Sequence, residues 1–141
     1  MSPLRKDPIV QRSLSILLPV KDAQATLIDS VHEILDVVTD SKDPFEVIII
    51  DDGSSDATSE VAHELTCHYP QVRLVRHHTP QGREAAIRTG LQRSQGEVVV
   101  MRNNEGGFSI LEQRSPTAKP FSSRPARPNY LSRLKNFTLG E

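Results

Sequence analysis

Two adjacent aspartates, Asp51 and Asp52, stand directly after the apolar run at residues 46–50. Two carboxylates in this position repel each other and are costly to desolvate, so they need hydrogen-bond donors, a metal or a ligand nearby. A nucleotide offers such donors in its base N–H groups and ribose hydroxyls. The alternative is a turn with a capping aspartate, which we favour for Ser55 and Asp56. For Asp52 the paired carboxylates favour ligand binding.

Two further polar segments follow apolar runs. Residues 19–22 read Pro-Val-Lys-Asp, and residues 102–105 read Arg-Asn-Asn-Glu. In an open parallel sheet, ligands bind beyond the carboxyl ends of the strands. The three polar segments are therefore expected to converge on one edge of the sheet and form a site there.

The elements that would position these residues follow from the apolar pattern. Short β-branched runs at residues 14–20, 46–50, 72–75 and 98–101 predict four strands, and segments with helical apolar spacing lie between them. Alternating strands and helices predict an α/β fold: an open, mainly parallel, Rossmann-like sheet of about four strands with flanking helices. His77 and His78 are expected in a surface loop. His63 and Cys67 share a helix face, but zinc needs three or four ligands.

The chain divides by composition into three parts. Residues 1–12 form a polar N-terminal lead, residues 13–107 the folded domain, and residues 108–141 an irregular, partly disordered tail rich in proline and arginine. Residues 1–105 contain 11 basic and 16 acidic residues, whereas residues 106–141 contain 6 basic and 2 acidic ones. The tail is therefore a basic segment attached to an acidic body.

The composition also narrows the class of protein. No apolar run approaches the roughly 20 residues that a membrane span needs, and the N-terminus lacks the apolar core of a secretory signal. Cys67, the single cysteine, excludes an internal disulfide. We expect a soluble cytoplasmic protein without a transmembrane segment. Because aromatic residues are few, we expect the basic tail to be solvated and do not expect nucleic acid as a partner.

Three blocks carry a resemblance to a known family. LSILLPVKDAQATL, EVIIIDDGSSDAT and QGREAAIRTGLQRSQGEVVV occur in this order within residues 13–105. They resemble consecutive blocks of family 2 glycosyltransferases, which have the GT-A fold, and especially the polyprenyl-phosphate glycosyltransferase branch. The resemblance implies that this is the half of such an enzyme that binds a nucleotide-diphosphate sugar, without the acceptor half.

The resemblance also assigns roles to residues. Pro19 and Val20 would hold the nucleotide, and Asp52 would contact its base or ribose with Asp51 in support. The third helix would lie beside the donor, where Arg88 could contact the diphosphate, and Arg83 less so. The alternative for both arginines is a solvated helix charge.

The family's metal-binding and catalytic features are altered in this sequence. The family ends its fourth strand with an Asp-x-Asp motif that binds Mg²⁺ or Mn²⁺, and Asn103-Asn104-Glu105 stands there instead. Glu105 and Asn103 remain as candidate metal ligands, so we expect metal binding to be weak or lost. No later block resembles the segment that supplies the base for inverting transfer, so the catalytic residues are unknown.

Three interpretations therefore remain open. The chain is an inverting family 2 glycosyltransferase whose acceptor site comes from a second chain, or it is a truncated, non-catalytic nucleotide-sugar-binding or interaction domain. A truncated reading frame is the third. An exposed sheet edge would favour association, which makes a homodimer plausible.

Overall fold

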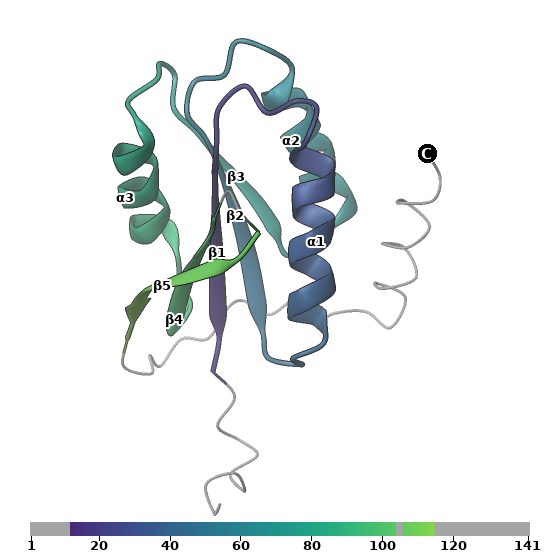
Figure 1. Cartoon of the computed structure of the whole chain (residues 1–141), viewed down its shortest axis with the longest axis vertical. Helices are drawn as coiled ribbons and strands as arrows, with labels where there is room; N and C mark the ends of the chain where they lie inside the picture. The colour runs from purple at the N-terminus through teal and green to yellow at the C-terminus, as the bar shows by residue number, and fades with distance from the viewer. Residues whose placement is uncertain (1–11, 104–105, 115–141) are drawn as a thin grey trace, which may run out of the picture.

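A computed structural model describes residues 12–103 and 106–114. Within them, five strands form one sheet in the order β3-β2-β1-β4-β5 (Figure 1). The strands are β1 (Leu14–Val20), β2 (Phe45–Asp51), β3 (Val72–Arg76), β4 (Val98–Arg102) and β5 (Phe108–Gln113). The helices are α1 (Leu27–Thr39), α2 (Thr58–His68) and α3 (Arg83–Arg93). The predicted α/β fold with an open, mainly parallel sheet is confirmed.

The fifth strand lies in the segment that the sequence placed in the irregular tail. β5 pairs antiparallel with β4, with a register shift between Val99 and Val100, so the folded domain continues past residue 107. Its sequence, FSILEQ, lacks a buried run because β5 is an edge strand, and Ile110 is 63% exposed. Residues 1–11 and 115–141 lie outside the described part of the chain, and so does the disorder predicted for the tail.

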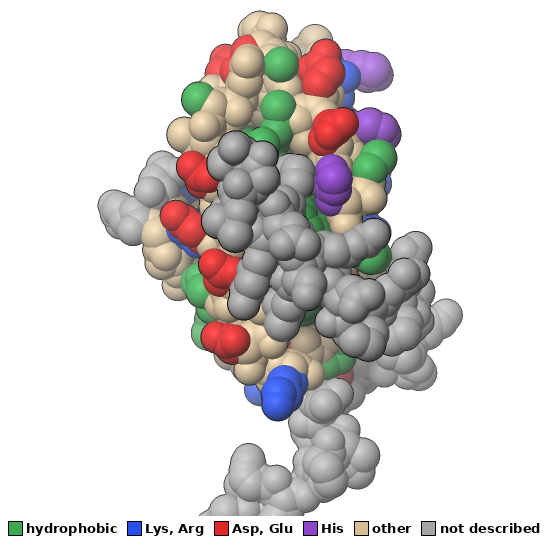
Figure 2. All heavy atoms as spheres, turned by 90° about the vertical axis from the view of Figure 1, so that its right-hand side faces the viewer, with side chains coloured by type: hydrophobic (Ala, Val, Ile, Leu, Met, Phe, Trp, Pro, Cys, Tyr) green, Lys and Arg blue, Asp and Glu red, His purple; other side chains and the backbone are tan. Residues whose placement is uncertain are grey.

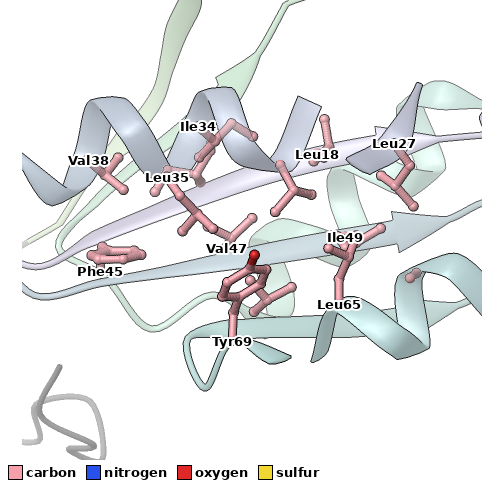
Figure 3. Packing of buried hydrophobic residues seen from close by; sticks show 14 of the residues in the cluster. Leu18, Leu27, Ile34, Leu35, Val38, Phe45, Val47, Ile49, Leu65 and Tyr69 are labelled. Atoms are coloured by element: carbon pink, nitrogen blue, oxygen red, sulfur yellow. The ribbon is translucent and has the colours of Figure 1, made fainter. Parts of the chain in front are cut away.

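The sheet is covered on both faces. α1 and α2 lie on one face and α3 on the other (Figure 1). Every residue of β2 is buried, as expected for a parallel strand between helical layers. Successive side chains alternate between the layers: Ile49 packs toward α1 and α2, while Ile48 and Ile50 belong to the cluster beneath α3. Figure 3 shows the first cluster, in which Leu35, Phe45 and Tyr69 converge.

Small residues let α3 approach the sheet closely. A Cβ added at Gly90 would lie 2.8 Å from a methyl group of Leu17 and 2.9 Å from one of Ile50. Ala86, one turn earlier on the same side of the helix, is fully buried. The backbone of α3 therefore packs directly on the sheet, which fixes the helix next to the strands it connects.

A buried polar cluster holds the edge of the sheet where the parallel strands begin. The Glu46 carboxylate accepts hydrogen bonds from the Ser15 hydroxyl (2.6 Å) and the backbone N–H of Gln95 (2.8 Å), and it pairs with Arg73 at 3.2 Å. Gly96 N–H in turn donates to Ser15 Oγ at 2.8 Å. These bonds join β1, β2, β3 and the loop after α3 at the edge opposite the predicted site.

The outward sides of α1 and α2 are acidic. Figure 2 faces this side of the molecule and shows acidic and histidine side chains gathered over it. The exposed acidic residues of the two helices are Asp29, Glu33, Asp36, Glu60 and Glu64. Among the described residues, no helix is long and apolar enough to span a bilayer.

Candidate functional site

The strand order reverses beside β1. The chain passes from β1 outward through β2 to β3, and α3 then returns it to β4 on the other side of β1. The carboxyl ends of β1 and β4 thus flank the switch point at which ligands bind in open α/β sheets. The pairing of these strands ends at Leu17 and Met101, three residues before β1 itself ends at Val20. β1 and β4 are therefore no longer paired at the predicted edge.

Val20 and the aspartate pair are neighbours at that edge. Val20 is in register with Asp51, and its carbonyl accepts a hydrogen bond from the Asp52 N–H at 2.9 Å. Because neighbouring residues of a strand face opposite sides, the backbone of Pro19 faces β4, beyond the end of their pairing. A proline is tolerated there since it removes no sheet hydrogen bond. Both residues are half-buried.

The loops that follow β1 and β2 are bonded to each other. Asp22 N–H donates to Ser54 Oγ (2.8 Å), and Asp22 Oδ1 accepts from Ser55 N–H (2.7 Å). Asp56 Oδ1 accepts from Thr58 N–H at 2.9 Å, and hydrogen bonds from the Thr58 hydroxyl and backbone lower the pKa of Asp56. Asp56 thus bonds to the first residue of α2, but Ala57 and not Asp56 or Ser55 is the N-cap, and Ser55 bonds to the neighbouring loop.

Asp51 is fully buried and shapes the turn after β2. Its Oδ1 accepts hydrogen bonds from the Ser54 N–H (3.1 Å) and hydroxyl (2.6 Å). Its Oδ2 lies 3.9 Å from Arg76 Nε and accepts no hydrogen bond from the described residues. The side chain is therefore positioned to support the loop and is shielded from solvent.

Asp52 is held by three donors from the segment between β3 and α3. Its Oδ1 accepts from His77 Nδ1 (2.7 Å) and Gln81 N–H (2.8 Å), and its Oδ2 from Gly82 N–H (2.9 Å). Burial acts to raise the pKa of Asp52, but these hydrogen bonds outweigh it and lower the pKa. A carboxylate offers about four acceptor sites, so Oδ2 keeps capacity for one more donor.

The expectation that His77 lies on the surface is wrong. Its side chain is only 8% exposed, and Nε2 lies 2.9 Å from the Thr89 hydroxyl of α3. His77 N–H donates to Asp51 O, which continues the β2–β3 pairing by one residue. The signal that was missed is the alternation of side chains along a strand. Val75 packs beneath α3, so His77, two residues later, faces α3 as well. His78 is exposed, as expected.

The two candidate arginines of α3 lie on different sides of the helix. Arg88 is exposed and two residues from both Ala86 and Gly90, which face the sheet, so it lies on the outward side of α3. Arg83, at the start of α3, reaches β4 instead, with its guanidinium 3.9 Å from Met101 Sδ. Arg83 thus contacts β4 next to the predicted edge, whereas Arg88 lies on the outward side of α3.

The end of β4 offers few ligands for a metal. Asn103 Oδ1 accepts a hydrogen bond from the Ser109 hydroxyl at 3.2 Å, and Glu105 lies outside the described residues. Nowhere in the described ranges do three or more His, Cys, Asp or Glu side chains gather as a metal site would require. Mg²⁺ and Mn²⁺ prefer several oxygen ligands, carboxylates above all. Of the two candidate ligands, the structure therefore describes only Asn103, which offers a neutral oxygen.

Comparison with known proteins decides the family. Residues 15–103 match the model described as glycosyl transferase family 2. The chain belongs to this family. The matched range covers the four parallel strands apart from Leu14, so the family assignment rests on the part of the sheet that builds the edge described above.

Two curated glycosyltransferases are similar to this chain in sequence. Human dolichyl-phosphate beta-glucosyltransferase is 32% identical over 102 residues, which cover 67% of this chain and 32% of that protein. Dolichyl-phosphate beta-glucosyltransferase ALG5A of Trichomonas vaginalis is 29% identical over 110 residues, covering 71% of this chain and 34% of that protein. The matched part of the chain spans about a third of these relatives' length.

Solved structures share the fold. The mannosyltransferase PcManGT of Pyrobaculum calidifontis, in complex with GDP-Man and Mn²⁺, matches with a TM-score of 0.53 and 24% identity over 67% of this chain and 28% of its own. TarS of S. aureus matches with a TM-score of 0.51 and 19% identity over 63% of this chain and 26% of its own. Both support the GT-A-like arrangement of the sheet.

Proposed function

We propose that this chain binds the nucleotide of a nucleotide-diphosphate sugar at the carboxyl ends of β1, β2 and β4, as the donor site of an inverting family 2 glycosyltransferase. The observation that carries the proposal is Asp52. Its carboxylate is fixed by three donors at the strand-end edge of the sheet, and Oδ2 keeps one acceptor site. A base N–H or a ribose hydroxyl of the nucleotide supplies the missing donor.

The other residues take roles according to their position. Pro19 and Val20 border the opening between β1 and β4, and Asp51 supports the loop from behind. We assign contact with the diphosphate to Arg83 instead of Arg88, because Arg83 reaches the end of β4. A guanidinium matches the oxygens of a diphosphate with a planar set of donors.

The proposed site depends little on a metal. Asn103 contributes a neutral oxygen that already accepts a hydrogen bond, whereas the structural neighbour PcManGT is in complex with Mn²⁺. We therefore expect Mn²⁺ to strengthen nucleotide binding only slightly here. Any metal that does bind would use Asn103 and Glu105 together with diphosphate oxygens.

A non-catalytic nucleotide-sugar-binding domain is the second candidate function. It is favoured by Asn103, whose neutral oxygen stands at the end of β4 where the family resemblance places a carboxylate. In this case the chain would bind the donor without transferring its sugar, or would act with a second chain that supplies the acceptor site. Turnover separates the two functions, since both require the nucleotide to bind.

Calorimetric titration with uridine and guanosine diphosphates, with and without Mn²⁺, tests the site. We expect one nucleotide to bind, Asp52→Ala to abolish binding, and Arg83→Ala to weaken it about two- to fivefold. Arg88→Ala, a matched loss of charge on the outer side of α3, should leave the affinity unchanged. If neither nucleoside diphosphate binds to the folded protein, the proposal is contradicted. Hydrolysis of a nucleotide-sugar donor by the protein would favour the catalytic function.

A further inference from the structure

His77 forms a buried link between the strand-end edge and α3. Its Nδ1 lies 2.7 Å from Asp52 Oδ1, and its Nε2 lies 2.9 Å from Thr89 Oγ1. The two contacts are on opposite sides of the ring, so one imidazole joins the residue after β2 to the middle of α3. The ring is buried, since His77 is only 8% exposed.

The two contacts also select a form of the ring. An ionised carboxylate only accepts hydrogen bonds, so the nitrogen that faces Asp52 must carry a proton. In the neutral ring Nε2 then accepts a hydrogen bond from the Thr89 hydroxyl. The tautomer of a histidine is set by its hydrogen-bond partners: Asp52 requires a proton on Nδ1, and the Thr89 hydroxyl is able to donate to the unprotonated Nε2.

This link bears on the orientation of Asp52. A carboxylate turns easily about its terminal torsion, and its two oxygens are chemically equivalent. His77 and Gln81 both donate to Oδ1, whereas Gly82 alone donates to Oδ2. Because Thr89 holds the opposite side of the ring, the Nδ1–H of His77 has a fixed direction. The two carboxylate oxygens of Asp52 therefore have different surroundings. Oδ2 is thereby left with the unused acceptor site.

We propose that His77 is the positioning residue of the nucleotide site: held by Thr89, it fixes the Asp52 carboxylate so that the free acceptor site of Oδ2 faces the ligand. This inference rests on the proposed function, in which that site takes a donor from the nucleotide. His77 does not contact the ligand and acts through Asp52. The hydrogen bond to Asp52 is charge-assisted and buried, so its loss should be large compared with that of an exposed contact.

Three variants separate the parts of the link. His77→Phe keeps a planar ring but removes both hydrogen bonds, and we expect nucleotide affinity to fall about ten- to hundredfold. His77→Asn places an amide N–H where Nδ1 stands, so it should restore affinity to within about fivefold of the original. Thr89→Val removes the hydroxyl at nearly constant volume and should weaken binding less than His77→Phe, and Thr89→Ser should reverse the loss.

A spectroscopic measurement on the ligand-free protein tests the geometry separately. Long-range ¹H–¹⁵N correlation spectra should show His77 with its proton on Nδ1. The ¹³C resonance of the Asp52 carboxyl should titrate at a higher pKa in His77→Phe than in the original protein, because a hydrogen bond that favours the charged form is gone. Far-UV circular dichroism confirms that each variant is folded.

The outcomes are distinct. A folded His77→Phe protein that binds nucleotide with unchanged affinity overturns the positioning role, as does a ring protonated on Nε2 alone. If no nucleotide binds to the original protein, while the spectra show the Nδ1 proton and the shifted Asp52 pKa, the proposed function fails and the link is purely structural. If His77→Phe is unfolded, the Thr89→Val and Thr89→Ser pair decides the question.

Discussion

Gly53 packs directly against the backbone of Pro80. A Cβ added to Gly53 would lie 2.6 Å from the Pro80 nitrogen, and its φ of +73° falls in the left-handed region. The contact presses the loop after β3 onto the turn after β2, next to Asp52. Glycine at position 53 therefore allows both the positive φ of the turn and the close approach of the Pro80 backbone.

Substitution of Gly53 should be costly for two reasons that can be separated. Gly53→Ala combines the left-handed φ with a clash against backbone, and we expect a loss of about 2–4 kcal/mol in the free energy of unfolding. Gly82→Ala is the matched control, since its φ is +104° but nothing lies within 4 Å of the added Cβ. With ψ at 159°, Gly82 lies in a backbone region almost confined to glycine, so Gly82→Ala should cost about 1–3 kcal/mol from strain alone. Urea denaturation measures both, and equal losses would show that the Pro80 contact is unimportant.

The polar cluster around Glu46 should contribute more to stability than an exposed ion pair. Glu46→Gln removes the charge that Ser15, Gln95 and Arg73 share, and we expect a loss of about 2–3 kcal/mol. Glu33→Gln removes the partner of Arg102 at the other end of the sheet. The Glu33 side chain is 61% exposed, and Arg102, although 11% exposed, keeps its contact with the Phe108 ring, so this change should cost about 1 kcal/mol, less than the loss at Glu46. Thermal unfolding of both variants measures the two losses. A larger loss of stability for Glu33→Gln than for Glu46→Gln would contradict the prediction.

The buried phenol of Tyr69 should make stability depend on alkaline pH. Burial raises the pKa of Tyr69 from 10.0 to about 12. The unfolded chain releases this proton first, so the contribution is complete below pH 10 and is lost as the pH rises toward 12. Tyr69→Phe also removes the contact with His32 at 3.1 Å and should cost about 1 kcal/mol at pH 8.

The comparison of these two proteins isolates the effect. The difference in unfolding free energy between the original protein and Tyr69→Phe should shrink as the pH rises from 10 toward 12, because only the original carries the phenol. Urea denaturation across this range measures it. A difference that stays constant would mean that the phenol is not buried in solution.

Asp52 should give the opposite dependence at acidic pH. Its pKa is lowered from 3.8, because hydrogen bonds to Gln81, His77 and Gly82 outweigh burial. The stabilisation is therefore complete above pH 3.8 and is lost as the pH falls through the lower value of the folded protein. Asp52→Asn should be less stable by about 1–3 kcal/mol at pH 7, and the difference should narrow under acid. An unchanged difference at pH 3 would assign the loss to packing.

The sequence alone determined the sheet and the edge that carries the candidate site. Short apolar runs mark β1, β2, β3 and β4, and segments with helical apolar spacing lie between them. Both patterns depend only on residues that are close together in the sequence. Asp52 could be placed at a strand end because Gly53 and the preceding apolar run mark where β2 stops. Val20 and Asp51 became neighbours once the strands were taken as parallel.

Tertiary structure decided which side chains complete that edge. The partners of Asp52 are His77, Gln81 and Gly82, at least 25 residues away, and no local pattern brings them to a carboxylate. Whether Arg83 or Arg88 faces the strands depends on which side of α3 packs on the sheet. β5 is held by pairing with β4 instead of by an apolar run of its own. Local sequence sets periodicity, whereas these contacts arise only when the helices dock.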